Sequence, residues 1–98
     1  MSLEIATTKA AEKASNAAAL DATVKFAFAE GGFLFVDGTN GNAVHNEDAE
    51  AECTVKLTLE DFLSMLDGVL NPMSAFMEGK MVVEGNMGTA MKLQSLFS

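Results

Sequence analysis

The positions of apolar residues predict a capped helix in the middle of the chain. Leu59, Phe62, Leu63, Leu66 and Leu70 follow the spacing of one helical face. Thr58 precedes them as an N-cap residue would, and Asp61 stands three residues later, where a capping box usually has Glu or Gln. We therefore expect a helix that begins after Thr58 and weakens at Gly68, near its end.

The next residues predict a second short helix, a strand and a closing helix. Asn71 is placed to cap the short helix, Pro72 to occupy its first position, and Gly79 to end it. The apolar residues expected on its face are Met73, Phe76 and Met77. Residues 80–84 are strand-like and Gly85-Asn86 is a turn. The closing helix carries an apolar stripe of Met87, Ala90, Met91 and Phe97.

The residues before this region alternate between apolar and polar positions, as strands do. From Ala22 the period is two, and Gly31-Gly32 marks a hairpin turn. The returning segment 33–36 is apolar on both faces, so we expect both of its faces to be covered. After a turn at 37–42, residues 43–45 form a short strand. Residues 49–57 then alternate without a break and predict the clearest strand in the chain.

These elements predict an α+β fold with a largely antiparallel five-stranded sheet covered on one face by helices. We expect the strands up to Thr58 to pair antiparallel through tight turns, and the segment leading to residues 81–84 to cross over the sheet. Residues 3–20 are Ala-rich and favour a helix that Ile5 would anchor. We expect a single domain over 1–98, with a helical lead-in (1–20), strands (22–58), helices (59–79), a strand (80–85) and a closing helix (86–98).

Composition excludes several classes of partner. The 98 residues carry a net charge of −8 and only 6 basic residues, all Lys, which argues against nucleic-acid binding and against docking on an anionic membrane. No apolar run approaches the length of a membrane span, so stable insertion is not expected. With neither a secretory signal nor a peroxisomal address of the Ser-Lys-Leu type, we expect a cytoplasmic protein.

Polar residues give no catalytic or metal-binding pattern. The segment from Asp37 to Asp48 begins like a calcium loop, but Asn42 replaces its glycine and Asp48 its bidentate Glu. His45 lacks a partner at ligand spacing, and we expect it at a strand end. Cys53 falls on the inward face of its strand, where it would act as a small apolar residue. We therefore expect no enzyme activity, cofactor or metal.

Motifs in the second half resemble the sterol carrier protein type-two domain family of nonspecific lipid-transfer domains. They are Leu59-Glu60-Asp61-Phe62, Asp67-Gly68, Asn71-Pro72, Ala75-Phe76-Met77, Gly79-Lys80 and Glu84-Gly85-Asn86. The resemblance covers residues 24–97; the N-terminal helical region is shorter than usual, and Asn86 stands where Asp is common. It implies that sheet and helices enclose an apolar tunnel for a fatty acid, fatty acyl-CoA, phospholipid or sterol.

The lipid-binding residues implied by the resemblance are Phe26, Phe28, Phe62, Leu66, Phe76, Met77, Met87 and Met91. The residues between 73 and 91 are unusually rich in Met, whose pliable side chain suits variable apolar partners. On spacing alone, such a stripe fits a packed core as well as a cavity. The predicted function is therefore non-catalytic lipid transfer or sequestration, the alternative being a closed-core accessory or regulatory module that acts through a protein partner.

Overall fold

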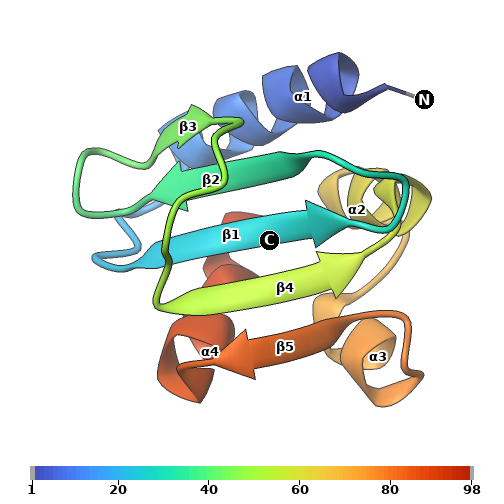
Figure 1. Ribbon diagram of the computed structural model, residues 1–98. Helices are drawn as coiled ribbons and strands as arrows, with labels where there is room; N and C mark the ends of the chain where they lie inside the picture. The colour runs from blue at the N-terminus through green and yellow to red at the C-terminus, as the bar shows by residue number, and fades with distance from the viewer. Residues whose placement is uncertain (1, 98) are drawn as a thin grey trace.

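The computed structural model describes residues 2–97, and their side chains as far as Leu93. Its five-stranded sheet has the order β3-β2-β1-β4-β5, from strands β1 (Thr23–Phe28), β2 (Phe33–Asp37), β3 (Ala43–His45), β4 (Cys53–Leu57) and β5 (Val82–Gly85). The pairs β1–β2, β2–β3 and β4–β5 are antiparallel. Helices cover one face of this sheet (Figure 1). The predicted α+β fold with a largely antiparallel sheet is confirmed.

Two predictions about the strand connections were wrong. β1 and β4 pair in parallel, with Val24 opposite Cys53 and Phe28 opposite Leu57. The cause is the connection 46–52, which runs across the sheet face opposite the helices and delivers the chain to the far side of β1 (Figure 1). The predicted strand at 49–57 accordingly begins only at Cys53. The segment 58–81 does not cross over the sheet either, because β5 lies directly beside β4.

The cap residues behave as the sequence predicts. α2 (Leu59–Leu66) is capped by Thr58, whose hydroxyl accepts a hydrogen bond from the Asp61 amide at 3.1 Å. The helix ends before Leu70 because Gly68 has a φ of 78°, a left-handed conformation that glycine adopts without strain. α3 (Pro72–Met77) begins after Asn71, and Gly79, with a φ of 77°, follows its C-cap. α4 (Met87–Phe97) follows β5.

The first helix, α1 (Leu3–Asn16), packs through alanines and ends earlier than predicted. Ile5 is half-exposed and does not anchor it; the buried residues are Ala6, Ala10 and Ala14. Small side chains let α1 lie close to α2 and β3. Its end is held by the buried Asn42, whose side-chain amide donates to the carbonyl oxygens of Ala14 and Ala18 at 3.1 and 3.2 Å. The turn at 37–42 thus fixes a helix end.

Phenylalanines fill the space between the sheet and α2. The Phe62 ring centroid lies 4.9 Å from that of Phe26 and 5.2 Å from that of Phe28. Phe26 and Phe62 are fully buried, and Phe28 nearly so. Cys53 and Leu66 are buried in the same core, as the strand and helix periodicities predict. The region beneath α2 is therefore packed by side chains.

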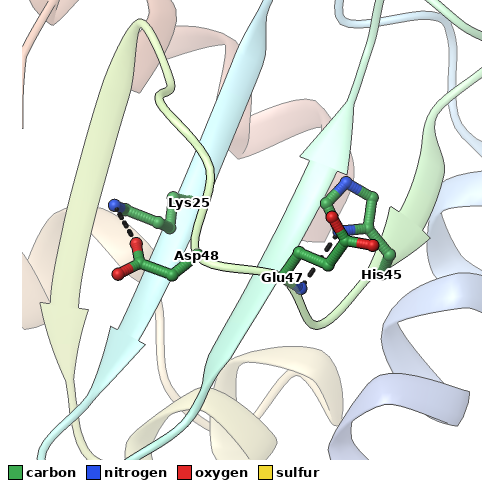
Figure 2. Close-up of polar contacts among 4 residues, drawn as sticks. All are labelled: Lys25, His45, Glu47 and Asp48. Atoms are coloured by element: carbon green, nitrogen blue, oxygen red, sulfur yellow. Dashed lines mark hydrogen bonds and ion pairs between the residues drawn. The ribbon is translucent and has the colours of Figure 1, made fainter.

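The opposite face of the sheet is partly covered by the connection 46–52. Lys25 on β1 reaches up to the Asp48 carboxylate at 2.7 Å, and its side chain is only 18% exposed (Figure 2). The Glu47 amide donates to Nδ1 of His45 at 3.1 Å, and the His45 ring stacks on Phe35. These contacts explain why the apolar strand β2 is covered on both faces, as predicted, and why His45 lies at a strand end.

Candidate functional site

An apolar pocket of about 100 Å³ opens between α3, β5 and α4. Its lining residues are Pro72, Met73, Phe76, Met81, Val83, Met87, Ala90, Met91 and Leu93. None of these side chains is charged or able to donate a hydrogen bond. The pocket can therefore hold an apolar group through burial alone, and a polar group of the same ligand would have to remain outside.

Local sequence signals set the directions of the two helices that form the walls. Oδ1 of Asn71 accepts hydrogen bonds from the amides of Met73 and Ser74 at 2.8 and 3.3 Å, which fixes the start of α3. Oδ1 of Asn86 accepts one from the Thr89 amide at 3.1 Å and fixes the start of α4. Asn86 therefore performs the capping role that Asp would perform at this position.

The pocket has a buried floor and an exposed rim. Met81 and Leu93 are buried, whereas Met73, Phe76 and Met87 remain about half-exposed and Met91 more so. Large apolar side chains in contact with water are costly to a folded protein unless another apolar surface covers them. The rim is thus a place where an apolar ligand would replace unfavourable hydration.

The structure divides the eight predicted lipid-binding residues into three groups. Phe76, Met87 and Met91 line the pocket together. A second group is buried in the packed core outside the pocket lining: Phe26, Phe28, Phe62 and Leu66. Met77 lies on α3 but is not part of the pocket lining and is 78% exposed.

Several lining residues were absent from the predicted set. Met73 could have been found from its spacing, because it lies three residues before Phe76 on one helical face. Ala90 belongs to the predicted stripe on α4 and Leu93 lies beside that stripe, whereas Met81 precedes β5 and Val83 lies within it, with their side chains in alternation. Phe97, a predicted member of that stripe, has a side chain outside the described part of the chain.

Reactive side chains lie away from the pocket. Burial raises the pKa of the Cys53 thiol, so the neutral form dominates near pH 7. Among residues 2–97 no cluster of three or more His, Cys, Asp or Glu side chains is arranged to hold a metal ion. Nor does any helix in that range combine the length and apolar character needed to cross a bilayer.

Fold and pocket together define an α+β domain whose helices and sheet edge form an apolar pocket. Comparison with protein families gives a match to the SCP-2 sterol transfer family over residues 3–98. The chain belongs to this family, as the motifs of its second half predict.

This chain matches only a small part of the length of its curated relatives. Human sterol carrier protein 2 is 46% identical over 61 residues, which is 62% of this chain and 11% of that protein. Human hydroxysteroid dehydrogenase-like protein 2 is 38% identical over 72 residues, covering 70% of this chain and 17% of that protein. The chain thus spans between about a tenth and a sixth of these relatives.

Solved structures show the same fold over the whole chain. Sterol carrier protein 2 from Aedes aegypti, solved in complex with the C16 fatty acid palmitate, superposes with a TM-score of 0.78 at 22% identity. The match covers 100% of this chain and 97% of that protein. At this identity the likeness establishes the architecture.

Proposed function

We propose that this chain binds lipid by taking an apolar chain or ring into the pocket between α3, β5 and α4, and carries or sequesters it without chemical change. One observation carries the proposal: the lining is apolar throughout, yet its rim of Met73, Phe76, Met87 and Met91 stays in water. A ligand that covers this rim would gain about 0.8 kcal/mol for each methylene it buries. The candidate ligands are a fatty acid, a fatty acyl-CoA, a phospholipid or a sterol.

Empty space of this size has a free-energy cost that a ligand would remove. An enclosed cavity destabilises a fold by about 24 cal/mol per Å³, so about 2 kcal/mol is an upper limit for this pocket of 100 Å³, because its rim is open to solvent. A long chain needs more room than this, and we propose that α4 moves outward to admit it. The helix closes the described chain, and its Met side chains can repack around a ligand more easily than branched ones.

The fold comparison supports a lipid ligand. The Aedes aegypti protein of the same architecture holds palmitate, and the family description names sterol transfer. In our proposal Phe76, Met87 and Met91 contact the lipid, and Met73 joins them. The supporting role goes to the core residues outside the lining, which hold the sheet and helices together: Phe26, Phe28, Phe62 and Leu66. Met77, the eighth residue that the resemblance implies, lies outside this lining and is not among the proposed contacts. A cytoplasmic location stays a prediction.

A second candidate function follows from the packing beneath α2. There the Phe62 ring packs against Phe26 and Phe28, as it would in a closed core, which favours an accessory module acting through a protein partner. In that case the exposed rim would bind a protein surface. The two functions make different predictions for free lipids.

A thermal-shift series with fatty acids of increasing chain length distinguishes them. A lipid carrier should gain about 2.7 kcal/mol at a ligand concentration one hundred times Kd, which raises Tm by about 11–22 °C in a domain of this size. The shift should grow with chain length because each methylene adds buried surface. A Tm that stays constant for every chain length would contradict the proposal, and native mass spectrometry of the purified protein would show which lipid it retains.

A further inference from the structure

The described methionines differ sharply in exposure, and the difference follows the pocket. Three lining residues reach solvent: Met73 at 47%, Met87 at 52% and Met91 at 70%. Met81 also lines the pocket but is 7% exposed, and Met65 is fully buried in the core. Met77 is 78% exposed and lies outside the pocket. A single apolar site therefore presents several solvent-exposed methionines.

We infer that Met73, Met87 and Met91 form an oxidation site at which hydroperoxides switch off lipid binding. The inference rests on the proposed function. A thioether is converted by a hydroperoxide into a sulfoxide, which is polar and chiral where the thioether was flexible and apolar. Three such groups around one pocket, on the facing walls α3 and α4, would change its chemistry far more than one sulfoxide on an open surface.

The reaction balances with the hydroperoxide as sole co-reactant. The sulfur lone pair attacks the terminal peroxide oxygen, so that an S–O bond forms and the O–O bond breaks. Sulfur is oxidised by two electrons, and the peroxide is reduced by the same two. The proton on the oxygen that becomes bonded to sulfur transfers to the departing oxygen, which leaves as water from hydrogen peroxide or as an alcohol from an organic hydroperoxide. A sulfoxide reductase would reverse the modification.

The lining explains why oxidation opposes ligand binding. A sulfoxide oxygen accepts hydrogen bonds, and a bound lipid would strip it of water. None of the lining side chains can donate a replacement hydrogen bond. Burying an unsatisfied polar group is unfavourable. The oxidised pocket should therefore prefer water to an apolar chain, with palmitate affinity about tenfold weaker.

Peptide mapping of the full chain with limiting hydrogen peroxide tests the site without any ligand. We expect sulfoxide at Met73, Met87 and Met91, and protection of Met65 and Met81. Preloading with palmitate should then protect the three lining residues and leave Met77, on the same helix as Met73, as reactive as before. Lining methionines that react no faster than Met65 in the ligand-free protein would overturn the site.

A second peptide-mapping experiment, with a fatty-acid hydroperoxide in place of hydrogen peroxide, tests where the peroxide comes from. A fatty-acid hydroperoxide, if it acts from within the pocket, should oxidise the three lining residues ahead of the more exposed Met77. If Met77 reacts first with this reagent as well, delivery by a bound chain is overturned and only dissolved peroxide remains.

Palmitate binding before and after oxidation tests the switch. Wild type and Met77→Leu should both lose about tenfold in affinity on peroxide treatment, because Met77 lies outside the pocket. The triple variant Met73→Leu/Met87→Leu/Met91→Leu should have the same Kd before and after treatment. Equal wild-type affinities before and after full oxidation would overturn the switch while leaving the carrier function intact. Failure of untreated protein to bind palmitate would refute the carrier function and the switch, and the mapping would still decide the oxidation site.

Discussion

Phe62 and Phe76 provide a direct comparison between a core and a pocket phenylalanine. Phe62 is 0% exposed and contacts the rings of Phe26 and Phe28. Phe76 is 42% exposed and lines the pocket. We predict that Phe62→Ala reduces stability and that Phe76→Ala reduces lipid affinity.

The magnitudes follow from burial and contacts. Phe62→Ala removes a fully buried ring and should cost about 3–5 kcal/mol of unfolding free energy, which lowers Tm by at least about 12 °C. Phe76 already keeps much of its surface in water, so its removal should cost only about 1 kcal/mol of stability. The same truncation removes one wall of the binding site, and a loss of about 1.4 kcal/mol weakens lipid binding tenfold.

Urea denaturation and displacement of a fluorescent fatty acid measure the two quantities on the same samples. Met77→Ala is the matched control on α3, and Glu50→Ala controls for a change on the exposed connection 46–52. Both controls should bind like wild type. The reasoning is refuted if Phe76→Ala binds as tightly as Met77→Ala. It is also refuted if Phe62→Ala remains as stable as wild type but loses the ligand, because the lipid would then lie beneath α2.

Four further predictions test other parts of the structure. Ala90→Leu should fill the pocket, raise the Tm of the lipid-free protein and abolish the palmitate-induced shift; an unchanged shift would place the ligand elsewhere. Asn42→Ala should lower the unfolding free energy measured in urea by about 2–4 kcal/mol, because it removes the hydrogen bonds to the carbonyl oxygens of Ala14 and Ala18 and leaves the Leu20 amide unpaired. Asn40→Ala on the exposed turn should change little. The raised pKa of the buried Cys53 thiol means that the unfolded chain releases this proton first as pH rises, so wild type should lose stability relative to Cys53→Ala between about pH 8 and pH 10, and parallel stability curves would contradict this. Hydrogen exchange over 87–97 should slow on addition of palmitate, and exchange there as slow without ligand as in β4 would refute the opening of α4.

Local signals predicted the helix boundaries because their causes lie within a few residues. Thr58 and Asn71 cap the helices that follow them, and glycines end those helices in left-handed conformations. A cap satisfies amides in its own first turn, so no distant contact is needed to specify it. The family could be predicted for the same reason, because several of its motifs, such as Asp67-Gly68 and Asn71-Pro72, lie at the ends and starts of these helices.

Packing decided which predicted residues share the site. Phe26, Phe62 and Phe76 all lie on apolar faces, and periodicity predicts burial for each of them equally. How deeply each side chain is buried depends on what packs against it. Phe62 contacts two other rings, whereas Phe76 lines the pocket between α3 and α4. Ile5 and Ala10 show the converse, because close helix packing favoured the smaller residue.

The sequence by itself determined the period of each strand, the caps of α2 and α3, the inward position of Cys53 and the family. The tertiary structure alone decided the parallel pairing of β1 with β4, because that depends on the connection 46–52 crossing the sheet rather than turning at its edge. It also decided that the pocket lies at the β5 edge, where α3 and α4 leave methionines facing one another across unfilled space. Apolar spacing states which side chains avoid water, and only the packed molecule determines whether another side chain or a ligand covers them.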